Sequence, residues 1–318
     1  MPVRLSIRVS SRAAARCARA YSSDAGPIVN VVNLPTANSG HIRILELNRP
    51  SARNAISRAL LSSLRAEIDD VQSQYTKDGE EVASSGAAGP TRALILASAV
   101  DASFCAGADL KERRGFTPEE TAVFLANLRG TFTKLSELPI PTISAVSSLA
   151  LGGGLELALS THFRVLASTA TVGLPETRLG IIPGAGGTYR LPALIGLARA
   201  RDLILTGRRV SAPEAYFLGI ADRLVEVVPE EELADGQNGS EETSIATRAR
   251  RSVLAEAVRM ASEICEGGPV AVRSALQAVS WAREEMENAM YERVVKTEDR
   301  DEALEAFREK RKPVFKGR

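Results

Sequence analysis

Two glutamates and two segments of small residues carry the groups that could do chemistry in this sequence. Glu156 follows the triple glycine 152–154, and Glu176 comes twenty residues later. The small-residue segment 104–109 precedes both. Two carboxylates can share general acid and general base work, while small residues let main-chain N–H groups approach a substrate oxygen and hold a developing negative charge. The combination indicates proton chemistry next to a carbonyl group.

Each of these features, taken alone, fits more than one role. The triple glycine suits an oxyanion, because it removes every Cβ from the turn and the following helix N-terminus adds about half a positive charge. The same glycines also permit tight packing of a helix on a strand. A phosphate site is a third option, but the run lacks the Lys-Ser/Thr of a P-loop and does not fit GxGxxG. By themselves, Glu156 and Glu176 fit solvated acids, and Glu176 also fits the start of a helix. The glycine-rich stretch 181–188 is expected to support the same pocket.

Composition restricts the class of protein. The chain has 318 residues, 44% hydrophobic and 25% charged, as in an ordinary globular protein with a substantial core. No stretch approaches the roughly 18 apolar residues of a membrane-spanning helix, so no membrane association is expected. Three cysteines without a CxxC pair and only two histidines predict reduced thiols and no metal site.

Residues 1–22 differ from the rest and resemble a mitochondrial presequence. Arginines recur every three to four positions at 4, 8, 12, 16 and 19, with no acid before Asp24. A disordered basic arm is the alternative. Removing these five arginines takes Lys+Arg from 40 to 35 against 39 Asp+Glu, so the net charge changes from +1 to −4. A mildly acidic mature protein is not a general nucleic-acid binder.

The pattern of apolar residues predicts an α/β core. Residues 28–48 alternate as a β-hairpin, and 57–75 have helical spacing with Ser57 as N-cap. Short apolar runs at 92–97, 142–146 and 162–167 predict buried strands, and Thr117-Pro118-Glu119-Glu120 predicts a helix start. The polar segment 77–89 is expected to be a flexible surface insertion. The order of elements indicates repeated βα units.

After residue 187 the predicted secondary structure is mainly helical. We expect helices at 189–206, 211–218, 246–266, 269–291 and 297–311, with a disordered insertion at 230–245. The domains are therefore predicted as a core at 28–206 and a helical C-terminal region at 207–318.

Three segments, in this order and spacing, resemble the enoyl-CoA hydratase/isomerase (crotonase) family. They are Phe-Cys-Ala-Gly-Ala-Asp-Leu-Lys-Glu-Arg at 104–113, Leu-Ala-Leu-Gly-Gly-Gly-Leu-Glu-Leu-Ala at 149–158, and Pro-Glu-Thr-Arg-Leu-Gly at 175–180 with Ile-Pro-Gly-Ala-Gly-Gly-Thr at 182–188. The resemblance covers nearly the whole mature chain. It implies an α/β, crotonase-like fold in which ββα repeats form a spiral core, with a C-terminal helical region for trimerisation.

The resemblance also implies roles for individual residues. Ala108 and Gly153 would supply the two N–H groups of an oxyanion hole, and Glu156 and Glu176 would hold a water between them, with the acid and the base left unassigned. The substrate would be an acyl-CoA thioester, and coenzyme A is part of that substrate, so no separate cofactor is expected. Its adenine and pantetheine would contact the stretch formed by Ala106, Ala108, Asp109, Leu110 and Lys111.

Two acids favour water addition over double-bond migration. The residues at 105–113 and at 306–313 most resemble the 3-methylglutaconyl-CoA hydratase branch of the family. This resemblance implies formation of 3-hydroxy-3-methylglutaryl-CoA in leucine degradation, in the mitochondrial matrix. A general short-chain enoyl-CoA hydratase is the alternative. A homotrimer or homohexamer is implied by the family, and a noncatalytic assembly subunit has no need of paired acids.

The branch also suggests binding to AU-rich RNA. Residues 111–134 offer only a net charge of +2 for it, from five basic and three acidic residues, a weak electrostatic footprint. The five basic residues are Lys111, Arg113, Arg114, Arg129 and Lys134.

Overall fold

Residues 26–82, 89–228 and 244–318 are described in the computed structural model of the chain. The predicted presequence at 1–22 and most of the predicted insertion at 230–245 lie outside these residues. The last two residues of that insertion are described, and they are ordered: Ser244 caps helix α8, which begins at Ile245. No described helix is long and apolar enough to cross a membrane.

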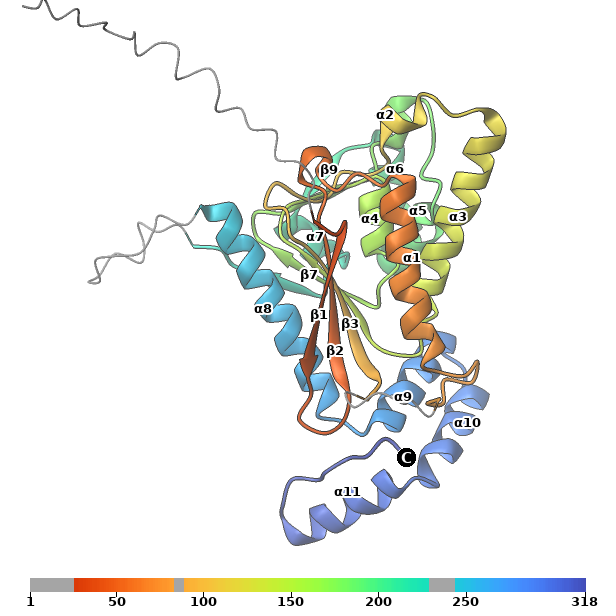
Figure 1. Cartoon of the computed structure of the whole chain (residues 1–318), viewed down its shortest axis with the longest axis vertical. Helices are drawn as coiled ribbons and strands as arrows, with labels where there is room; N and C mark the ends of the chain where they lie inside the picture. Colours follow the sequence, from red (N-terminus) through yellow and green to blue (C-terminus); the bar gives the residue numbers. More distant parts are fainter. Residues whose placement is uncertain (1–25, 83–88, 229–243) are drawn as a thin grey trace, which may run out of the picture.

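The strands form two sheets of mainly parallel pairing. The larger sheet has the order β1-β2-β3-β5-β7-β10 and the smaller one β4-β6-β8-β9 (Figure 1). Only β1/β2 and β8/β9 pair antiparallel among the described strands. The first of these pairs is the hairpin predicted over 28–48. The strands are β1 Val29–Pro35, β2 His41–Leu47, β3 Thr91–Ser98, β4 Ser103–Cys105, β5 Thr142–Val146, β6 Leu149–Leu151, β7 Phe163–Ala167, β8 Thr171–Gly173, β9 Arg209–Ser211 and β10 Arg223–Val225.

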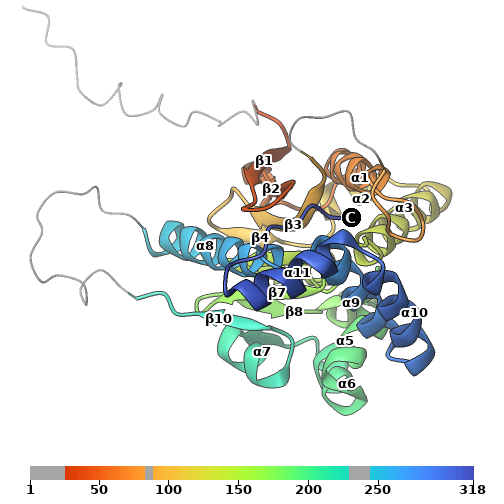
Figure 2. The ribbon, with the colours of Figure 1, turned by 90° about the horizontal axis from the view of Figure 1, so that it is seen from below.

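Strand β3 is buried on both faces, as its apolar run predicts. Leu94 and Leu96 pack with helices α1 (Arg58–Ser73) and α3 (Pro118–Ser136) in one hydrophobic core. Ala93 and Ile95 point the other way, into a second core with α8 (Ile245–Cys265). Figures 1 and 2 show the sheet between α8 on one side and α1 and α3 on the other.

The predicted caps start the two long helices of the core. The Ser57 side chain accepts a hydrogen bond from the Leu60 N–H at the start of α1. Thr117 and Glu120 form a reciprocal capping box ahead of α3. These side chains satisfy N–H groups that the first helical turn leaves without partners.

Two of the predicted C-terminal helices are wrong in length. The helix expected over 189–206 is broken at Gly196, which has a φ of +81°, into α5 (Gly187–Ile195) and α6 (Leu197–Thr206). The helix expected over 269–291 ends at Ala282, whose φ is +48°, and gives α9 (Pro269–Trp281) and α10 (Glu284–Val295). Helices α7 (Ala212–Leu218) and α11 (Glu298–Glu309) lie close to the expected positions.

The α/β core extends past residue 206, where the sequence places its boundary. Strand β9 joins the smaller sheet and β10 joins the edge of the larger one. Helix α8 packs against β3, β5 and β7. Strands of three residues are too short to show a periodicity, so this extension has no clear sequence signal.

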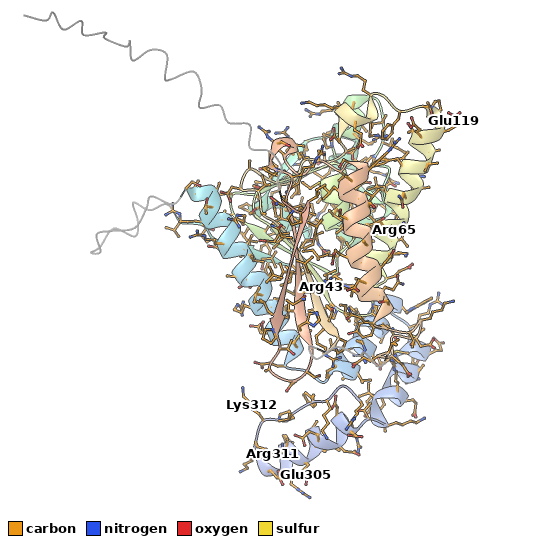
Figure 3. All side chains as sticks on the ribbon, in the orientation of Figure 1. Arg43, Arg65, Glu119, Glu305, Arg311 and Lys312 are labelled. Atoms are coloured by element: carbon orange, nitrogen blue, oxygen red, sulfur yellow. The ribbon has the colours of Figure 1, made fainter. Side chains whose placement is uncertain are left out.

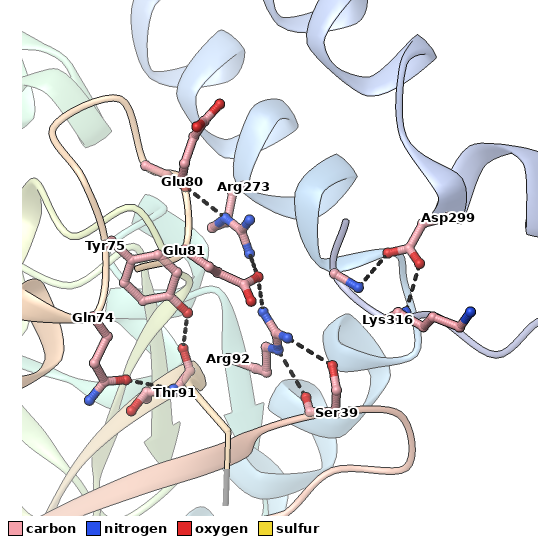
Figure 4. Close-up of polar contacts among 12 residues, drawn as sticks. Ser39, Gln74, Tyr75, Glu80, Glu81, Thr91, Arg92, Arg273, Asp299 and Lys316 are labelled. Carbon is pink, nitrogen blue, oxygen red and sulfur yellow. Dashed lines mark hydrogen bonds and ion pairs between the residues drawn. The ribbon is translucent and has the colours of Figure 1, made fainter. Parts of the chain in front are cut away.

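The C-terminal region is tied to the core by a buried polar cluster (Figure 4). The carboxylate of Glu81 contacts Arg92, at the start of β3, and accepts a 2.7 Å bond from Nη1 of Arg273 in α9. The predicted flexible insertion at 77–89 is therefore wrong over its described first part, because Glu81 is held by two arginines. Asp299 fixes the chain end by accepting bonds from the N–H groups of Lys316 (2.6 Å) and Gly317 (2.8 Å). Beyond this cluster, α11 and its neighbourhood present charged side chains, including Glu305 and Lys312 (Figure 3).

Candidate active site

One cavity of about 580 Å³ collects the residues that the sequence singles out for catalysis. Its lining includes Ala108 and Gly153 from two turns and Glu156 and Glu176 from two later segments. The turns lie at the carboxyl ends of β4 and β6, which are parallel neighbours in the smaller sheet. Parallel pairing brings these two turns together although they are forty-five positions apart in the sequence.

The N–H groups of Ala108 and Gly153 lie side by side. A Cβ built on Gly153 would be 3.7 Å from the Ala108 nitrogen, and one built on Gly107 would be 3.5 Å from the Gly153 nitrogen. Neither N–H donates to another residue in the described part of the chain. Gly107 has a φ of +96°, a conformation that glycine adopts without strain. The two donors can thus converge on one oxygen atom of a ligand.

The loop after β2 holds the Ala108 segment in place. The Ile56 N–H donates to the Gly107 carbonyl at 2.7 Å, and the Asp109 N–H donates to the Ile56 carbonyl at 3.1 Å. Ala108 lies between these two bonds. The segment therefore pairs with Ile56 as two parallel strands would, and the Ala108 N–H points away from Ile56.

Asn54 is a further residue of this support, which the sequence does not single out. It is fully buried and has a φ of +56°. Its Nδ2 donates to Ser98 Oγ (2.8 Å) and to the carbonyls of Ser103 (3.3 Å) and Phe104 (3.0 Å). Asn tolerates the left-handed region better than most residues, so the only local sign of its role is its residue type.

The triple glycine serves packing as well as exposure of an N–H. A Cβ on Gly154 would lie 2.1 Å from the Cys105 carbonyl oxygen, so α4 (Gly153–Ala158) can pass this close to β4 only with glycine there. Gly152, with a φ of +53°, makes the turn, and Gly153 presents its N–H to the cavity. The packing interpretation is therefore confirmed, and the oxyanion interpretation stays a prediction.

Glu156 is buried beneath the start of α5. Its Oε1 accepts bonds from the N–H groups of Ala185 (2.7 Å) and Gly187 (2.8 Å). Burial raises the pKa of Glu156 above its ordinary value, and the two backbone donors oppose that rise by favouring the ionised form. The supporting role predicted for 181–188 is confirmed by these two bonds.

Glu176 begins the short 3-10 helix Glu176–Leu179 but is only 8% exposed. Burial raises the pKa of Glu176 to about 7, and the nearby Glu156 contributes to the rise. Its Oε2 is buried with no hydrogen-bond partner among the described residues. The interpretation of the two glutamates as solvated acids is therefore wrong: Glu156 is 2% exposed.

The segment expected to contact coenzyme A lies at the cavity, although not all of its side chains do. Ala106, Ala108 and Leu110 line it. Asp109 instead caps α2 (Leu110–Arg113), because its Oδ1 accepts the N–H of Lys111 at 3.1 Å, while its Oδ2 pairs with Arg49 Nη1 at 2.7 Å. Lys111 is exposed beside the cavity.

Two arginines, Arg113 and Arg129, also line the cavity. The sequence marks both as members of a weakly basic stretch, and the family resemblance also offers Arg113 as a candidate near the phosphates of coenzyme A. The described residues contain no group of three His, Cys, Asp or Glu side chains placed to hold a metal ion. The site thus offers two N–H donors for an oxygen, one carboxylate held by backbone donors, and one carboxyl group that titrates near neutrality.

Similar proteins of known sequence or structure have names of the enoyl-CoA hydratase type. A family model described as Enoyl-CoA hydratase/isomerase matches residues 37–318. A relative from Pyricularia oryzae named Methylglutaconyl-CoA hydratase 1, mitochondrial, is 62% identical over 338 residues, which cover 99% of this chain and 97% of the relative. Enoyl-CoA hydratase domain-containing protein 2, mitochondrial, from Homo sapiens is 39% identical and covers 95% of each chain. The solved enoyl-CoA hydratase from Bacillus anthracis matches with a TM-score of 0.75 at 38% identity, over 92% of this chain and 100% of that one.

Proposed function

The chain belongs to the enoyl-CoA hydratase/isomerase family, and from that premise we propose that it is a hydro-lyase that adds water across the double bond of an enoyl-CoA thioester. The observation that carries the proposal is the presence of two buried carboxyl groups, Glu156 and Glu176, in the cavity that also receives the N–H groups of Ala108 and Gly153. Water addition transfers one proton from the water and one to the substrate, so two groups are used.

The thioester carbonyl oxygen would accept hydrogen bonds from Ala108 and Gly153. These donors stabilise the negative charge that develops on the oxygen as the enolate forms. Because they are backbone groups fixed by neighbouring pairing, they need no reorganisation during the reaction.

The two glutamates would divide the proton work. Glu156, whose carboxylate accepts two backbone N–H bonds, would take a proton from the water as its oxygen attacks Cβ. Glu176, whose pKa is raised to about 7, would be protonated in part of the population and would give its proton to Cα. The O–H bonds of the water and of protonated Glu176 and the π bond between Cα and Cβ break, while the C–O, C–H and Glu156 O–H bonds form. Loss of the proton from Glu156 and uptake of one by Glu176 restore the starting state.

We propose 3-methylglutaconyl-CoA as the substrate and 3-hydroxy-3-methylglutaryl-CoA as the product, as in leucine degradation. The name of the Pyricularia oryzae relative and its 62% identity support this choice. The names of other relatives, such as the 59% identical Enoyl-CoA isomerase/hydratase from Zymoseptoria tritici, keep a general short-chain hydratase as the alternative.

The coenzyme moiety would lie along the segment from Ala106 to Lys111, since its first residues line the cavity. The mitochondrial names of four relatives and the arginine-rich segment 1–22 support a mitochondrial location, for which we propose the matrix. A homotrimer or homohexamer is proposed on family membership, with α9 to α11 as the contacting region.

RNA binding finds less support than catalysis. Of the five basic residues behind that alternative, Arg113 and Arg129 line the cavity. Lys134 pairs with Asp69 at 2.5 Å. The remaining basic groups of the stretch, Lys111 and Arg114, are too few for a strong electrostatic footprint.

Hydration assays of crotonyl-CoA and 3-methylglutaconyl-CoA test the proposal. The wild-type protein should hydrate both and prefer the second, whereas Glu156→Gln and Glu176→Gln should each lose about 10²- to 10⁴-fold in kcat. Near-UV circular dichroism of both variants serves as the folding control. Full activity in either variant would rule out the two-carboxylate mechanism, and a preference for crotonyl-CoA would support the general hydratase.

A further inference from the structure

The cavity has an arginine placed next to the loop that holds Glu156. Arg129 lies on α3, and its Nε donates to the Gly184 carbonyl at 2.7 Å. The next residue, Ala185, donates its N–H to Glu156 Oε1. Burial raises the pKa of Glu156, and the charges of Arg190 and Arg129 oppose that rise together with the two backbone donors. Arg129 is therefore fixed near the reacting centre.

The rest of the guanidinium is available to a ligand. The bond to Gly184 uses Nε, and neither Nη atom donates to an acceptor in the described part of the chain. Nη2 lies 3.9 Å from where a Cβ on Gly184 would be, so it is held along the loop. Two parallel Nη donors in a fixed plane match a carboxylate.

Apolar side chains dominate the lining of this cavity. They include Leu125, Leu128, Leu179, Ile181 and Ile182. Leu125 lies beside Arg129, since Leu125 Cδ2 and Arg129 Nη2 are 3.8 and 3.9 Å from a Cβ built on Gly184. A carboxylate entering such a lining without a charged partner loses its hydration at a large cost. A substrate with a second negative charge would therefore need a cation here, and a plain alkyl chain would not.

The second arginine of the cavity lies elsewhere. Arg113 ends α2, the helix that begins within the segment proposed for coenzyme A, and its guanidinium lies 5.8 Å from the ring centre of Phe124. Arg129 instead contacts Gly184, whose neighbour Ala185 donates to Glu156. The two arginines thus have different neighbours, and Arg129 is the one joined to the loop that holds Glu156.

We propose that Arg129 is a specificity-determining residue that binds a carboxylate at the far end of the acyl group, so that the site selects thioesters of dicarboxylic acids. The inference rests on the proposed function, because it takes the cavity to hold an acyl-CoA. It names the residue that would separate 3-methylglutaconyl-CoA from crotonyl-CoA.

Kinetics of Arg129→Met, which keeps the length of the stem and removes the charge, provide the first test. The ratio of kcat/KM for 3-methylglutaconyl-CoA to that for crotonyl-CoA should fall about 10- to 100-fold, the effect of losing hydrogen bonds to a charged group. Arg113→Met is the matched control and should leave that ratio within about twofold of the wild type. An equal loss on both substrates in Arg129→Met would overturn the proposal, because it would mean that Arg129 only supports the Gly184 loop.

Binding of saturated thioesters separates this inference from the proposed function. By calorimetry, the wild type should bind glutaryl-CoA more tightly than butyryl-CoA, and Arg129→Met should lose that preference. Equal binding of the two by the wild type would overturn the role of Arg129 even if the protein is a hydratase. A preference that depends on Arg129 in a protein without hydratase activity would support the carboxylate site and reject the proposed reaction.

Discussion

The carboxylate of Glu156 accepts a 2.8 Å hydrogen bond from the N–H of Gly187, which holds the start of α5 against the site. A Cβ on Gly187 would lie 3.1 Å from the same carboxylate oxygen and 2.9 Å from Leu174 Cδ1. The glycine thus allows the helix to approach the acid, and the acid satisfies an N–H that a helix start leaves without a partner. Glu156 therefore has a structural partner as well as a proposed chemical one, while Glu176 has an oxygen with no protein partner among the described residues.

The rate of hydration should fall above about pH 7. Burial raises the pKa of Glu176 to about 7, and the proposed mechanism needs its protonated form. Above that pH, kcat/KM for the hydration should decrease about tenfold per pH unit. Rates measured between about pH 5.5 and 9 check this, with the melting temperature followed over the same range. A rate that stays constant across the alkaline part of that range in the folded protein would contradict the assignment of Glu176 as the acid.

The same shift should appear in stability. Because the folded pKa of Glu176 is raised from 4.5 to about 7, the folded state binds the proton more tightly than the unfolded state. The stabilisation is complete below about pH 4.5 and is lost as the pH rises through about 7. Glu176→Gln lacks this titration, so its melting temperature relative to the wild type should rise between about pH 5 and 7.5. A constant difference across that range would mean that Glu176 is not shifted.

Gly154→Ala should damage both the fold and the site. Its Cβ would meet the Cys105 carbonyl oxygen at 2.1 Å, which forces α4 away from β4. We expect a loss of about 1–3 kcal/mol in the free energy of unfolding and a lower kcat, because Gly153 would move with α4. Gly115→Ala is the control, since its nearest neighbour would be 3.8 Å away. Similar urea midpoints for the two variants would refute the close approach.

Asn54→Ala should destabilise the turn after β4 that carries the Ala108 N–H. The buried Phe104 carbonyl would lose the Asn54 donor, at about 1–3 kcal/mol for an unsatisfied group, while the Ser103 carbonyl would keep its 2.8 Å bond from Ser98 Oγ. The urea midpoint and kcat on crotonyl-CoA should both decrease. The matched control is Asn127→Ala, which removes an exposed 2.7 Å bond to Arg65. An Asn54 variant as stable and active as the Asn127 variant would show that the loop holds its shape without this side chain.

Glu81→Gln should release the C-terminal region. The side chains of Arg92 and Arg273 are only 5% and 3% exposed, so both would keep a buried charge without its counter-ion. Breaking a buried pair costs about 3–5 kcal/mol. Glu305→Gln, which breaks an exposed pair with Arg308, should have a much smaller effect (Figure 3). Equal melting temperatures of the two variants, at one protein concentration, would contradict the role of Glu81.

Sequence reasoning succeeds here where a signal is local. Ser57 and Thr117 mark helix starts through side-chain caps, and the apolar run of β3 marks a strand covered on both faces. The residues that the sequence proposes for catalysis line one cavity, and they could be proposed because they lie in segments with a strong family resemblance. In each case, the residues that define the feature are neighbours along the chain.

The features that the sequence misses depend on distant partners. Asn54 contacts groups 44 to 50 positions away, and Glu81 pairs with Arg273 at a separation of 192. Nothing near either residue specifies those partners. Ala282 adopts a left-handed conformation without being a glycine, so the break between α9 and α10 has no local mark.

The two donors at Ala108 and Gly153 are main-chain atoms, and this has a consequence for the evolution of the enzyme. A point mutation cannot delete a peptide N–H except by introducing proline. The two donors are therefore retained as long as the backbone keeps its course at Ala108 and Gly153. Substitutions of side chains around the cavity can therefore change which acyl group fits, while the two donors proposed for the thioester oxygen stay in place.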